Sequence, residues 1–332
     1  MTTDSAGRLR WGILGTGGIA AAFARDLQPV DDAEVIAVGS RSAESASGFA
    51  GRLGVPRAHG SYERLVDDPE VDVVYVATPQ TAHAANVRLA LEAGKPVLCE
   101  KPFTVTAAEA RDLVELARER GLFLMEAMWT RFLPHFRRID ELLRSGALGD
   151  VTTVVADHGQ AIPADPGHRL QRPDLAGGAL LDLGVYPVSL ASYVLGRPDG
   201  VSAAGTIAPN GVDAQTSAVL TYASGAHAVV TTTLRARTAN RAVITGTEAR
   251  LEIDDVWYTP TSFSLLRPGS AQPERFERPR DGGGLRHQAV EAGRLLRAGR
   301  TESDVMPLDE TVAIMETLDE IRRQIGLRFP TE

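Results

Sequence analysis

The chain has 332 residues, of which 43% are hydrophobic, 5% aromatic and 23% charged. This composition is typical of an ordinary soluble globular protein and excludes a collagen-like, coiled-coil or disordered chain. The 35 Lys and Arg residues are outnumbered by 43 Asp and Glu, which leaves a net charge of −8 without a long basic run. We therefore expect no nucleic acid and no membrane surface among its partners.

The length of the chain and its cysteine content further limit the class of protein to which it can belong. At roughly 100–200 residues per domain, the length predicts two domains. The sequence has one cysteine, Cys99, which excludes an internal disulfide and a cysteine-based metal site. The first ten residues lack the apolar stretch of a signal peptide, and we find no uninterrupted apolar run of membrane-spanning length. These features predict a cytoplasmic protein.

The first 100 residues alternate short apolar runs with helical patterns. The runs predict strands that are covered on both faces, as in a doubly wound parallel sheet. The predicted strands are Arg10–Gly15, Glu34–Gly39, Val71–Ala77 and Pro96–Glu100. The predicted helices are Gly18–Leu27, Ser42–Leu53, Tyr62–Val66 and Thr81–Ala93, followed by a helix that a capping box opens at Thr106 and Gly121 ends.

After about residue 128 the pattern changes to short segments with alternating hydrophobicity. Such alternation predicts a largely antiparallel sheet with one covered face, and Ala223–Gly225 predicts a hairpin turn. The predicted strands are Val151–Asp157, Ser202–Ile207, Ala214–Tyr222, Ala226–Arg235, Ala242–Thr245 and Arg250–Ile253. The predicted helices are Arg131–Ser145, Gly177–Leu195, Gly284–Ala298 and Leu308–Gly326. The proline-containing segment Gln160–Ala176 is either a lid or a plain surface loop.

A glycine-rich motif follows the first predicted strand and opens the first helix. In the pattern G-x-G-x-x-A, Gly15 makes the tight turn, Gly17 lies beside a pyrophosphate and Ala20 allows close helix–strand packing. The adjoining backbone of the helix N-terminus offers free N–H groups to phosphates. The predicted dinucleotide-binding residues here are Gly15, Thr16, Gly17, Gly18 and Ile19.

The end of the second strand favours NADP over NAD. Enzymes that use NAD usually place Asp or Glu there for the ribose 2′-hydroxyl, whereas this chain has Ser40 and Arg41. An arginine can pair with a 2′-phosphate through two hydrogen bonds, and a serine can add a hydroxyl donor. We therefore predict NADP as the cofactor, with NAD as the second choice.

Two further motifs carry groups suited to proton transfer. Glu100-Lys101-Pro102 ends a buried parallel strand, where α/β enzymes place their ligands. Asp182 and Tyr186 are four residues apart, so on a helix both side chains project from one face. From these residues alone, Tyr186 is either a packed core residue with a satisfied hydroxyl or a group that transfers a proton. A lysine ammonium within roughly 4–6 Å of a tyrosine lowers the pKa of the phenol, which suits the tyrosine for acid–base catalysis near neutral pH.

These segments together resemble the Gfo/Idh/MocA family of NAD(P)-dependent oxidoreductases. The matching pieces are GILGTGGIA, the segment from Ala77 to Phe103, and GGALLDLGVYPVS at Gly177–Ser189. Met125–Pro134 and the tyrosine at 186 are most similar to the dihydrodiol dehydrogenase and NADP-dependent D-xylose dehydrogenase branch of the family. Many other members have a histidine at that position.

The resemblance implies a fold and roles for individual residues. It implies a Rossmann domain at residues 1–127, then an α+β domain at 128–332 whose large, mostly antiparallel open sheet forms a subunit interface. Lys101 and Tyr186 would be the catalytic pair, and Asp182 would bind substrate hydroxyls or support Tyr186. The residues implied at the nicotinamide are Thr78, Pro79, His83 and Glu100. Those implied at the substrate pocket are Trp129 and Arg131.

Several polar residues remain with two interpretations. His158 at a strand end is a reserve proton donor and candidate substrate ligand, or a packed histidine. His168, Arg169 and Arg172 could meet an acidic substrate such as a nucleotide sugar, or form a solvated loop. The seven histidines show no metal-ligand spacing, so we predict no catalytic metal.

We predict an NADP-dependent oxidoreductase that transfers a hydride between nicotinamide and a CH–OH or C=O group of a sugar, cyclic polyol or dihydrodiol. Tyr186 would exchange the proton with the help of Lys101. The alternatives are a ketoreductase of a nucleotide-linked sugar, an NAD-dependent glycoside hydrolase that works by internal oxidation and re-reduction, and a non-catalytic NADP-binding regulator. We expect a homodimer or homotetramer.

Overall fold

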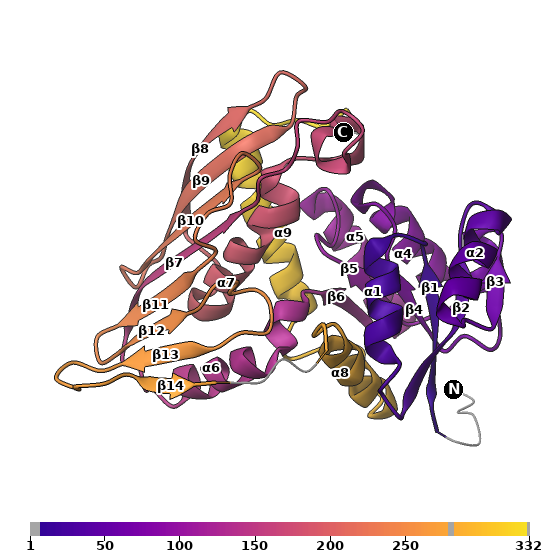
Figure 1. Ribbon diagram of the computed structural model, residues 1–332, viewed down its shortest axis with the longest axis horizontal. Coiled ribbons are helices and arrows are strands. Elements are labelled where there is room, and N and C mark those ends of the chain that lie inside the picture. Colours follow the sequence, from indigo (N-terminus) through magenta and orange to yellow (C-terminus); the bar gives the residue numbers. More distant parts are fainter. Residues whose placement is uncertain (1–6, 278–281, 331–332) are drawn as a thin grey trace. The chain divides into compact units, whose positions relative to one another are not determined.

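The computed structural model describes residues 7–277 and 282–330, which form two compact units (Figure 1). The first unit contains the chain up to Thr104, then Ala108–Phe132 and Gly282–Thr311. The second contains Val105–Ala107, the chain from Leu133 to the gap, and the chain after Thr311.

This division differs from the predicted one in the place of Gly282–Thr311, which was assigned to the second domain. In this segment α8 (Arg286–Arg297) packs against α1 (Gly18–Leu27) of the first unit. The carboxylate of Asp26 on α1 accepts the backbone N–H groups of Gly283 and Arg286, both at 2.8 Å. Contacts between residues so distant in the sequence leave no mark on local patterns.

The first unit is built on a six-stranded parallel sheet in the order β3-β2-β1-β4-β5-β6. This confirms the predicted doubly wound parallel sheet. Its strands are β1 (Leu9–Leu14), β2 (Ala33–Gly39), β3 (Arg57–His59), β4 (Val73–Val76), β5 (Val97–Glu100) and β6 (Leu124–Ala127). The sequence patterns missed β3, whose three residues are too few to show a period, and β6, whose residues Leu124–Ala127 include no β-branched or aromatic side chain.

Five helices connect the strands of this unit: α1, α2 (Ala43–Leu53), α3 (Tyr62–Val66), α4 (His83–Glu92) and α5 (Ala107–Arg120). Helix α8 joins the unit from a later part of the chain. Helix α1 presents Phe23 to the sheet, where its ring stacks on Tyr75 with centroids 3.9 Å apart and meets the edge of Trp11 at 5.4 Å. Burial of such large rings contributes much of the free energy that holds helix to sheet.

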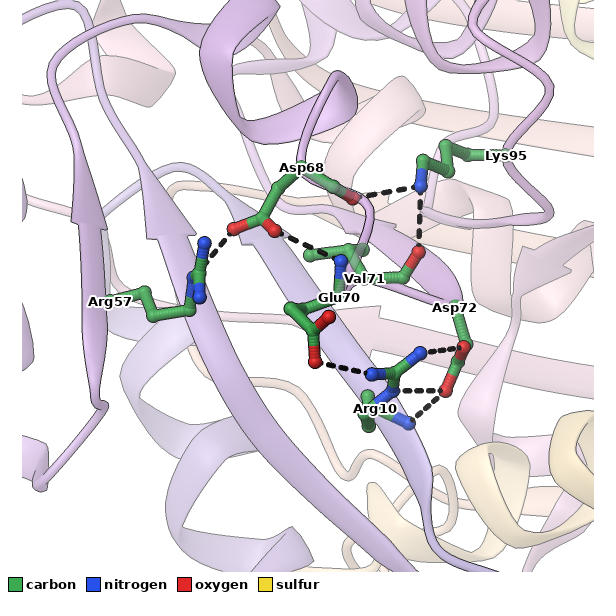
Figure 2. Close-up of polar contacts among 7 residues, drawn as sticks. All are labelled: Arg10, Arg57, Asp68, Glu70, Val71, Asp72 and Lys95. Atoms are coloured by element: carbon green, nitrogen blue, oxygen red, sulfur yellow. Dashed lines mark hydrogen bonds and ion pairs between the residues drawn. The ribbon is translucent and has the colours of Figure 1, made fainter. Parts of the chain in front are cut away.

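A polar cluster holds the loop between α3 and β4 (Figure 2). Its members are Arg10, Arg57, Asp68, Glu70, Val71, Asp72 and Lys95. The carboxylate of Asp72 accepts the backbone N–H of Arg10 at 2.9 Å and a guanidinium N–H of the same residue at 2.8 Å. Lys95 donates to the carbonyl groups of Asp68 and Val71, both at 2.8 Å. The cluster lies at the amino ends of β1, β4 and β5, away from the glycine turn, so we assign it to stability.

The second unit is built on an eight-stranded sheet in the order β14-β13-β12-β11-β7-β10-β9-β8. Its strands are β7 (Val151–Gly159), β8 (Gly200–Ile207), β9 (Asp213–Thr221), β10 (His227–Thr233), β11 (Ala242–Gly246), β12 (Arg250–Ile253), β13 (Phe263–Leu266) and β14 (Glu274–Phe276). Among these described strands the pairs are antiparallel except β7 with β10, which confirms the mostly antiparallel sheet. Gly225, at a φ of +83°, forms the predicted hairpin turn between β9 and β10.

Helices cover one face of this sheet (Figure 1). They are α6 (Pro134–Arg144), α7 (Val185–Leu195) and α9 (Leu308–Ile325), and a π-helical turn, Leu180–Gly184, leads into α7. Val154, Ala228 and Leu220 are in register on three adjacent strands and are buried on the covered face. The neighbouring valines on these strands face the other side and are exposed.

The segment Gln160–Ala176 is anchored to the second unit. Its Leu170 is buried against Ala179, Leu183 and Leu234, with Ile162 packed beside them. The backbone N–H of Ile162 also donates to the carbonyl of Leu234 at 2.8 Å. Of the two predicted alternatives, this packing favours an ordered surface loop.

One apolar segment, Pro173–Leu195, is long enough and hydrophobic enough to cross a membrane, but 83% of its most apolar window is buried within the protein. The sequence patterns overlooked its length because Asp182 interrupts it. Its hydrophobicity is that of a core segment packed against the second sheet.

Candidate active site

The glycine turn of the first unit has the geometry of a phosphate cradle. Gly15 has a φ of +110°, and a Cβ there would lie 2.6 Å from the carbonyl oxygen of Ala77. This position therefore requires glycine. A Cβ at Gly17 or Gly18 would meet no atom within 4 Å, so the N-terminus of α1 opens onto free space. Its first N–H groups have no partner within the helix, and an anion such as a pyrophosphate fits there.

Arg41 lies where the second strand ends, and it has an unpredicted neighbour. Ser40 is buried and its backbone N–H donates to the carbonyl of His59 at 3.1 Å, whereas Arg41 is exposed. Burial raises the pKa of Tyr62 on α3, and the Arg41 guanidinium, which hydrogen-bonds the phenol, partly offsets this rise. The exposed guanidinium is placed to bind a phosphate, and Tyr62 holds it. Nothing in the local sequence pattern marks Tyr62 as a site residue beyond its aromatic type.

His83 connects the turns that follow β4 and β5. Its ring is 1% exposed, with Nδ1 at 2.9 Å from the carbonyl oxygen of Pro102 and Nε2 at 2.9 Å from that of Thr78. Burial lowers the pKa of His83. The positive charge of Lys101 lowers it further, whereas the hydrogen bonds to the two carbonyl groups raise it. The structure therefore gives His83 a task in holding these turns together. Its predicted contact with nicotinamide, like that of Thr78 and Pro79, stays a prediction.

Glu100 organises the turn that carries Lys101. Its carboxylate accepts the hydroxyl of Tyr75 at 2.5 Å and the backbone N–H of Lys101 at 3.2 Å. The next bond, Lys101–Pro102, is cis. The backbone N–H of Phe103 donates to the carboxyl of Glu126 at 3.1 Å. The turn is thus held on both sides of Lys101 by buried carboxyl groups.

Trp129 and Arg131 lie on a 3₁₀ turn, Trp129–Phe132, after β6. The Arg131 side chain is 2% exposed, with a guanidinium N–H donating to Glu310 at 2.7 Å. The ion pair with Glu310 gives the buried Arg131 a structural role within the first unit. The structure does not expose it for a substrate, and the predicted substrate role of both residues stays a prediction.

Asp182 and Tyr186 lie together in the second unit, where the π-helical turn passes into α7. Both are buried, at 6% and 7% exposure. The Asp182 carboxylate accepts two hydrogen bonds from one guanidinium nitrogen of Arg169, at 2.9 and 3.1 Å, and the Arg169 side chain is 59% exposed. Of the loop residues that were open to two interpretations, Arg169 therefore joins the site. Arg172 pairs with Asp174, and His168 accepts the backbone N–H of Leu170 at 3.2 Å.

The aromatic rings of Tyr186, His158 and Tyr258 pack against one another. His158 stacks on Tyr258 with centroids 3.9 Å apart, and Tyr186 lies 5.0 Å from Tyr258 and 5.3 Å from His158. Burial raises the pKa of Tyr258 to about 12, although a hydrogen bond with Gln160 opposes the rise. Tyr258 and Gln160 were not predicted as site residues, because only the folded sheet brings them to Tyr186.

His158 has a defined hydrogen-bonding state. Its Nδ1 lies 3.2 Å from the carbonyl oxygen of Leu183, which can only accept, so Nδ1 carries the proton. Its Nε2 then accepts from the side-chain amide of Gln160 at 3.0 Å. Both ring nitrogens of His158 thus have hydrogen-bonding neighbours within the protein, and its predicted roles as reserve proton donor and substrate ligand stay predictions.

Within the described residues, no three His, Cys, Asp or Glu side chains are grouped as metal ligands. Cys99 is fully buried, and burial raises the pKa of its thiol well above the usual value. The first unit therefore carries a phosphate cradle and the Lys101 turn, and the second unit carries the Asp182–Tyr186 group.

Comparison with known proteins places both units in one family. Residues 9–128 match the model of the Gfo/Idh/MocA oxidoreductase family with an NAD-binding Rossmann fold, and residues 136–252 match the C-terminal domain of the same family. The chain is 39% identical over 335 residues to a trans-1,2-dihydrobenzene-1,2-diol dehydrogenase of Macaca fascicularis, with 98% of this chain and 99% of that protein covered. It is 40% identical over 364 residues to the D-xylose 1-dehydrogenase (NADP(+)) of Hypocrea jecorina, with 97% and 93% covered.

Solved structures agree with this result. An aldose-aldose oxidoreductase from Caulobacter crescentus complexed with glycerol has a TM-score of 0.87 at 28% identity, covering 96% of this chain and 98% of that one. A 3-ketoreductase from Actinomadura kijaniata in complex with NADP and TDP-benzene has a TM-score of 0.82 at 29% identity, with the same coverage. The chain therefore belongs to the Gfo/Idh/MocA family of oxidoreductases, as its phosphate cradle and its Asp182–Tyr186 group had indicated.

Proposed function

We propose that the protein is an NADP-dependent oxidoreductase that interconverts a CH–OH and a C=O group on a sugar, a cyclic polyol or a dihydrodiol. The observation that carries the proposal is the buried pair of Asp182 and Tyr186, with Arg169 on the carboxylate and Tyr258 beside the phenol. Relatives named as a dihydrodiol dehydrogenase and a D-xylose dehydrogenase, each matched over nearly the whole chain, support this substrate class.

The residues of the second unit suit a polyhydroxylated substrate. A carboxylate held by a guanidinium can accept a substrate hydroxyl while Arg169 donates to a neighbouring oxygen. The phenol of Tyr186 can give a proton to a forming alkoxide or take one from an alcohol. We assign Lys101 to assist this transfer, because an ammonium group favours the phenolate.

The first unit suits the cofactor. The N-terminus of α1 would hold the pyrophosphate, and Arg41 and Ser40 would hold the 2′-phosphate of NADP. When bound, the nicotinamide supplies the hydride chemistry that amino-acid side chains lack. The named relative from Hypocrea jecorina uses NADP, in agreement with this choice.

The test is turnover measured by nicotinamide absorbance. NADP⁺ and NAD⁺ are offered separately with aldoses, inositols and cyclic diols, and NADPH with the corresponding ketones. Turnover of a sugar or diol with NADP(H) is the expected result. NADP(H) binding without turnover of any member of the panel would contradict the proposal and favour a regulator.

A ketoreductase of nucleotide-linked sugars is a second candidate, which the similarity to the 3-ketoreductase from Actinomadura kijaniata favours. The panel therefore includes a nucleotide-linked 3-keto sugar with NADPH. Turnover of this substrate alone would select the second candidate. Glycoside cleavage without a net change in nicotinamide absorbance would instead indicate the hydrolase.

We also propose that the protein is cytoplasmic and forms a homodimer through the uncovered face of its second sheet. Val155, Val229 and Val219 are paired across β7, β10 and β9 on this face, at 45%, 37% and 37% exposure. A row of exposed apolar side chains on a flat sheet is typical of a protein interface. The single buried Cys99 leaves no internal disulfide, in agreement with a reducing compartment.

A further inference from the structure

The segment that carries Asp182 and Tyr186 is anchored by a side chain from outside it. Ala179, at the N-cap of the π-helical turn, has no side chain that can accept a hydrogen bond. The backbone N–H of Leu180 instead donates to Oδ2 of Asp213, the first residue of β9, at 2.8 Å. An orphan donor at a helix start is thereby satisfied from the neighbouring sheet.

Asp213 is held in this position by burial and by a second hydrogen bond. It is fully buried, and the hydroxyl of Thr216 donates to the same Oδ2 at 2.9 Å. Gly178 has a φ of +127°, and a Cβ there would lie 2.1 Å from Oδ1 of Asp213. Gly178 therefore makes room for this carboxyl group, whereas a Cβ at Gly177 would meet the carbonyl oxygens of Arg169, Leu170 and Arg172. Burial raises the pKa of Asp213 to about 7, and its hydrogen bonds with Thr216 and Leu180 oppose the rise.

Two further side chains from the sheet hold the same segment. The hydroxyl of Thr232 on β10 lies 3.3 Å from the carbonyl oxygen of Ala179 and 3.0 Å from that of His158. His158 on β7 donates to the carbonyl of Leu183 at 3.2 Å. The backbone is thus held at Ala179 and Leu180 before Asp182 and at Leu183 after it. π-Helical turns are frequent at functional sites, and this one is kept in place from three strands.

We infer that Asp213 is a positioning residue for the proposed reaction, because it anchors the amide of Leu180 and so sets where Asp182 and Tyr186 stand. This inference rests on the proposed function of those two residues. Asp213 touches neither substrate nor cofactor in this role. An asparagine can take over much of it, because one oxygen, Oδ2, accepts both donors and an amide oxygen can do the same.

The test compares Asp213→Ala and Asp213→Asn with the control variant Asp72→Ala. Asp72 is a matched control because it also accepts a backbone N–H and a side-chain donor, but at the amino end of β4 in the first unit. The readouts are kcat and KM on the best substrate of the panel, NADP binding, thermal unfolding, and amide hydrogen exchange of residues 179–186.

We expect Asp213→Ala to lower kcat by roughly 100-fold, since a displacement of about 1 Å at the reacting groups has that effect. NADP binding should be unchanged, and exchange at 179–186 should accelerate. Asp213→Asn should recover most of kcat. Asp72→Ala should lower the unfolding temperature without changing kcat of the folded enzyme or exchange at 179–186.

The inference is overturned if folded Asp213→Ala keeps the wild-type kcat or the wild-type exchange at 179–186. It is also overturned if Asp72→Ala reproduces both effects. If Asp213→Ala does not fold, Thr216→Val removes one of the two donors and is measured in the same way. If wild type turns over no substrate in the panel, the proposed function is what fails, and hydrogen exchange alone then decides the anchoring.

Discussion

Tyr186 and Tyr258 lie side by side in the second unit, with ring centroids 5.0 Å apart, and we assign them different roles. Burial raises the pKa of Tyr258 to about 12, so this phenol keeps its proton at neutral pH and serves as a hydrogen-bonding neighbour. We propose Tyr186, which follows the turn that carries Asp182, as the phenol whose hydroxyl exchanges a proton with substrate.

The first prediction concerns that hydroxyl. Tyr186→Phe should lower kcat by roughly 10²- to 10⁴-fold, the usual contribution of a positioned acid–base group, and leave NADP affinity unchanged. Tyr193→Phe on the same helix is the control, because its phenol points to the carbonyl of Phe136 at 3.5 Å and removal of its hydroxyl is the same chemical change. Steady-state kinetics and cofactor titration are the measurements. A Tyr186→Phe enzyme with near-normal turnover would remove this residue from the mechanism.

The second prediction concerns cofactor choice at Arg41. Arg41→Ala should weaken NADP binding by about 10- to 100-fold, because a hydrogen bond to a charged group contributes about 1.5–3 kcal/mol. NAD binding should change little, since NAD lacks the 2′-phosphate. Fluorescence titration with both cofactors measures the ratio, and Arg52→Ala, on the exposed surface of α2, is the control. Equal losses for NADP and NAD would contradict the assignment.

At the level of elements, the Lys101 turn depends on a carboxyl group from the neighbouring strand. Glu126 on β6 is fully buried and accepts the backbone N–H of Phe103. Burial raises the pKa of Glu126 to about 7, although the charge of Arg131 and a hydrogen bond with the hydroxyl of Thr311 both lower it. A strand side chain thus stabilises a functional turn, and its own proton affinity makes that stability depend on pH.

The third prediction follows from this shift. The folded-state pKa of Glu126 lies above its ordinary value of 4.5, so its contribution to stability is complete below that value and is lost as the pH rises through about 7. Between about pH 5 and pH 8, the free energy of unfolding should fall less in Glu126→Gln than in wild type, by on the order of 3 kcal/mol. Urea unfolding at several pH values measures this difference.

Glutamine can still accept the Phe103 N–H, so the substitution removes the titration while keeping the turn. Glu115→Gln on the exposed side of α5 is the control and should leave the pH dependence unchanged. Identical pH profiles for wild type and Glu126→Gln would show that Glu126 does not titrate in this range.

At the level of the whole molecule, the second sheet leaves one face uncovered by its own helices (Figure 1). Val243, Val155, Val229 and Val219 follow one another in register across β11, β7, β10 and β9. Aligned side chains on one face of a sheet act as a unit, so a partner sheet could bury the whole row. A second copy of the chain meets this requirement with two-fold symmetry.

The fourth prediction tests this association. Light scattering after size-exclusion chromatography should give a dimer for wild type and a monomer for Val229→Lys, because the charge would be buried at the centre of the interface. Val290→Lys is the control, since this valine is 44% exposed on α8 in the first unit. A Val229→Lys protein that remains dimeric would exclude this face as the interface.

The residues that the sequence predicted well lie in short motifs. Gly15 and Gly17 belong to one turn, and Asp182 and Tyr186 to adjacent turns of one segment, so their geometry depends mainly on local backbone conformation. The strands β3, β6, β13 and β14 were missed; each has only three or four residues and takes its place through pairing with neighbouring strands. The structural pairing of Arg131 with Glu310 was missed because the two are far apart along the chain.

The sequence by itself determined the family, the parallel and antiparallel sheets, the phosphate cradle and the chemistry of the catalytic candidates. These follow from the order of apolar and polar residues and from the few conformations that glycine motifs allow. Only the tertiary structure decided that Arg169 meets Asp182, that Tyr258 flanks Tyr186 and that Asp213 anchors the amide of Leu180 at the start of the turn that carries Asp182. Each of these contacts joins residues that are separated along the chain, and their packing depends on the whole chain rather than on any single pattern within it.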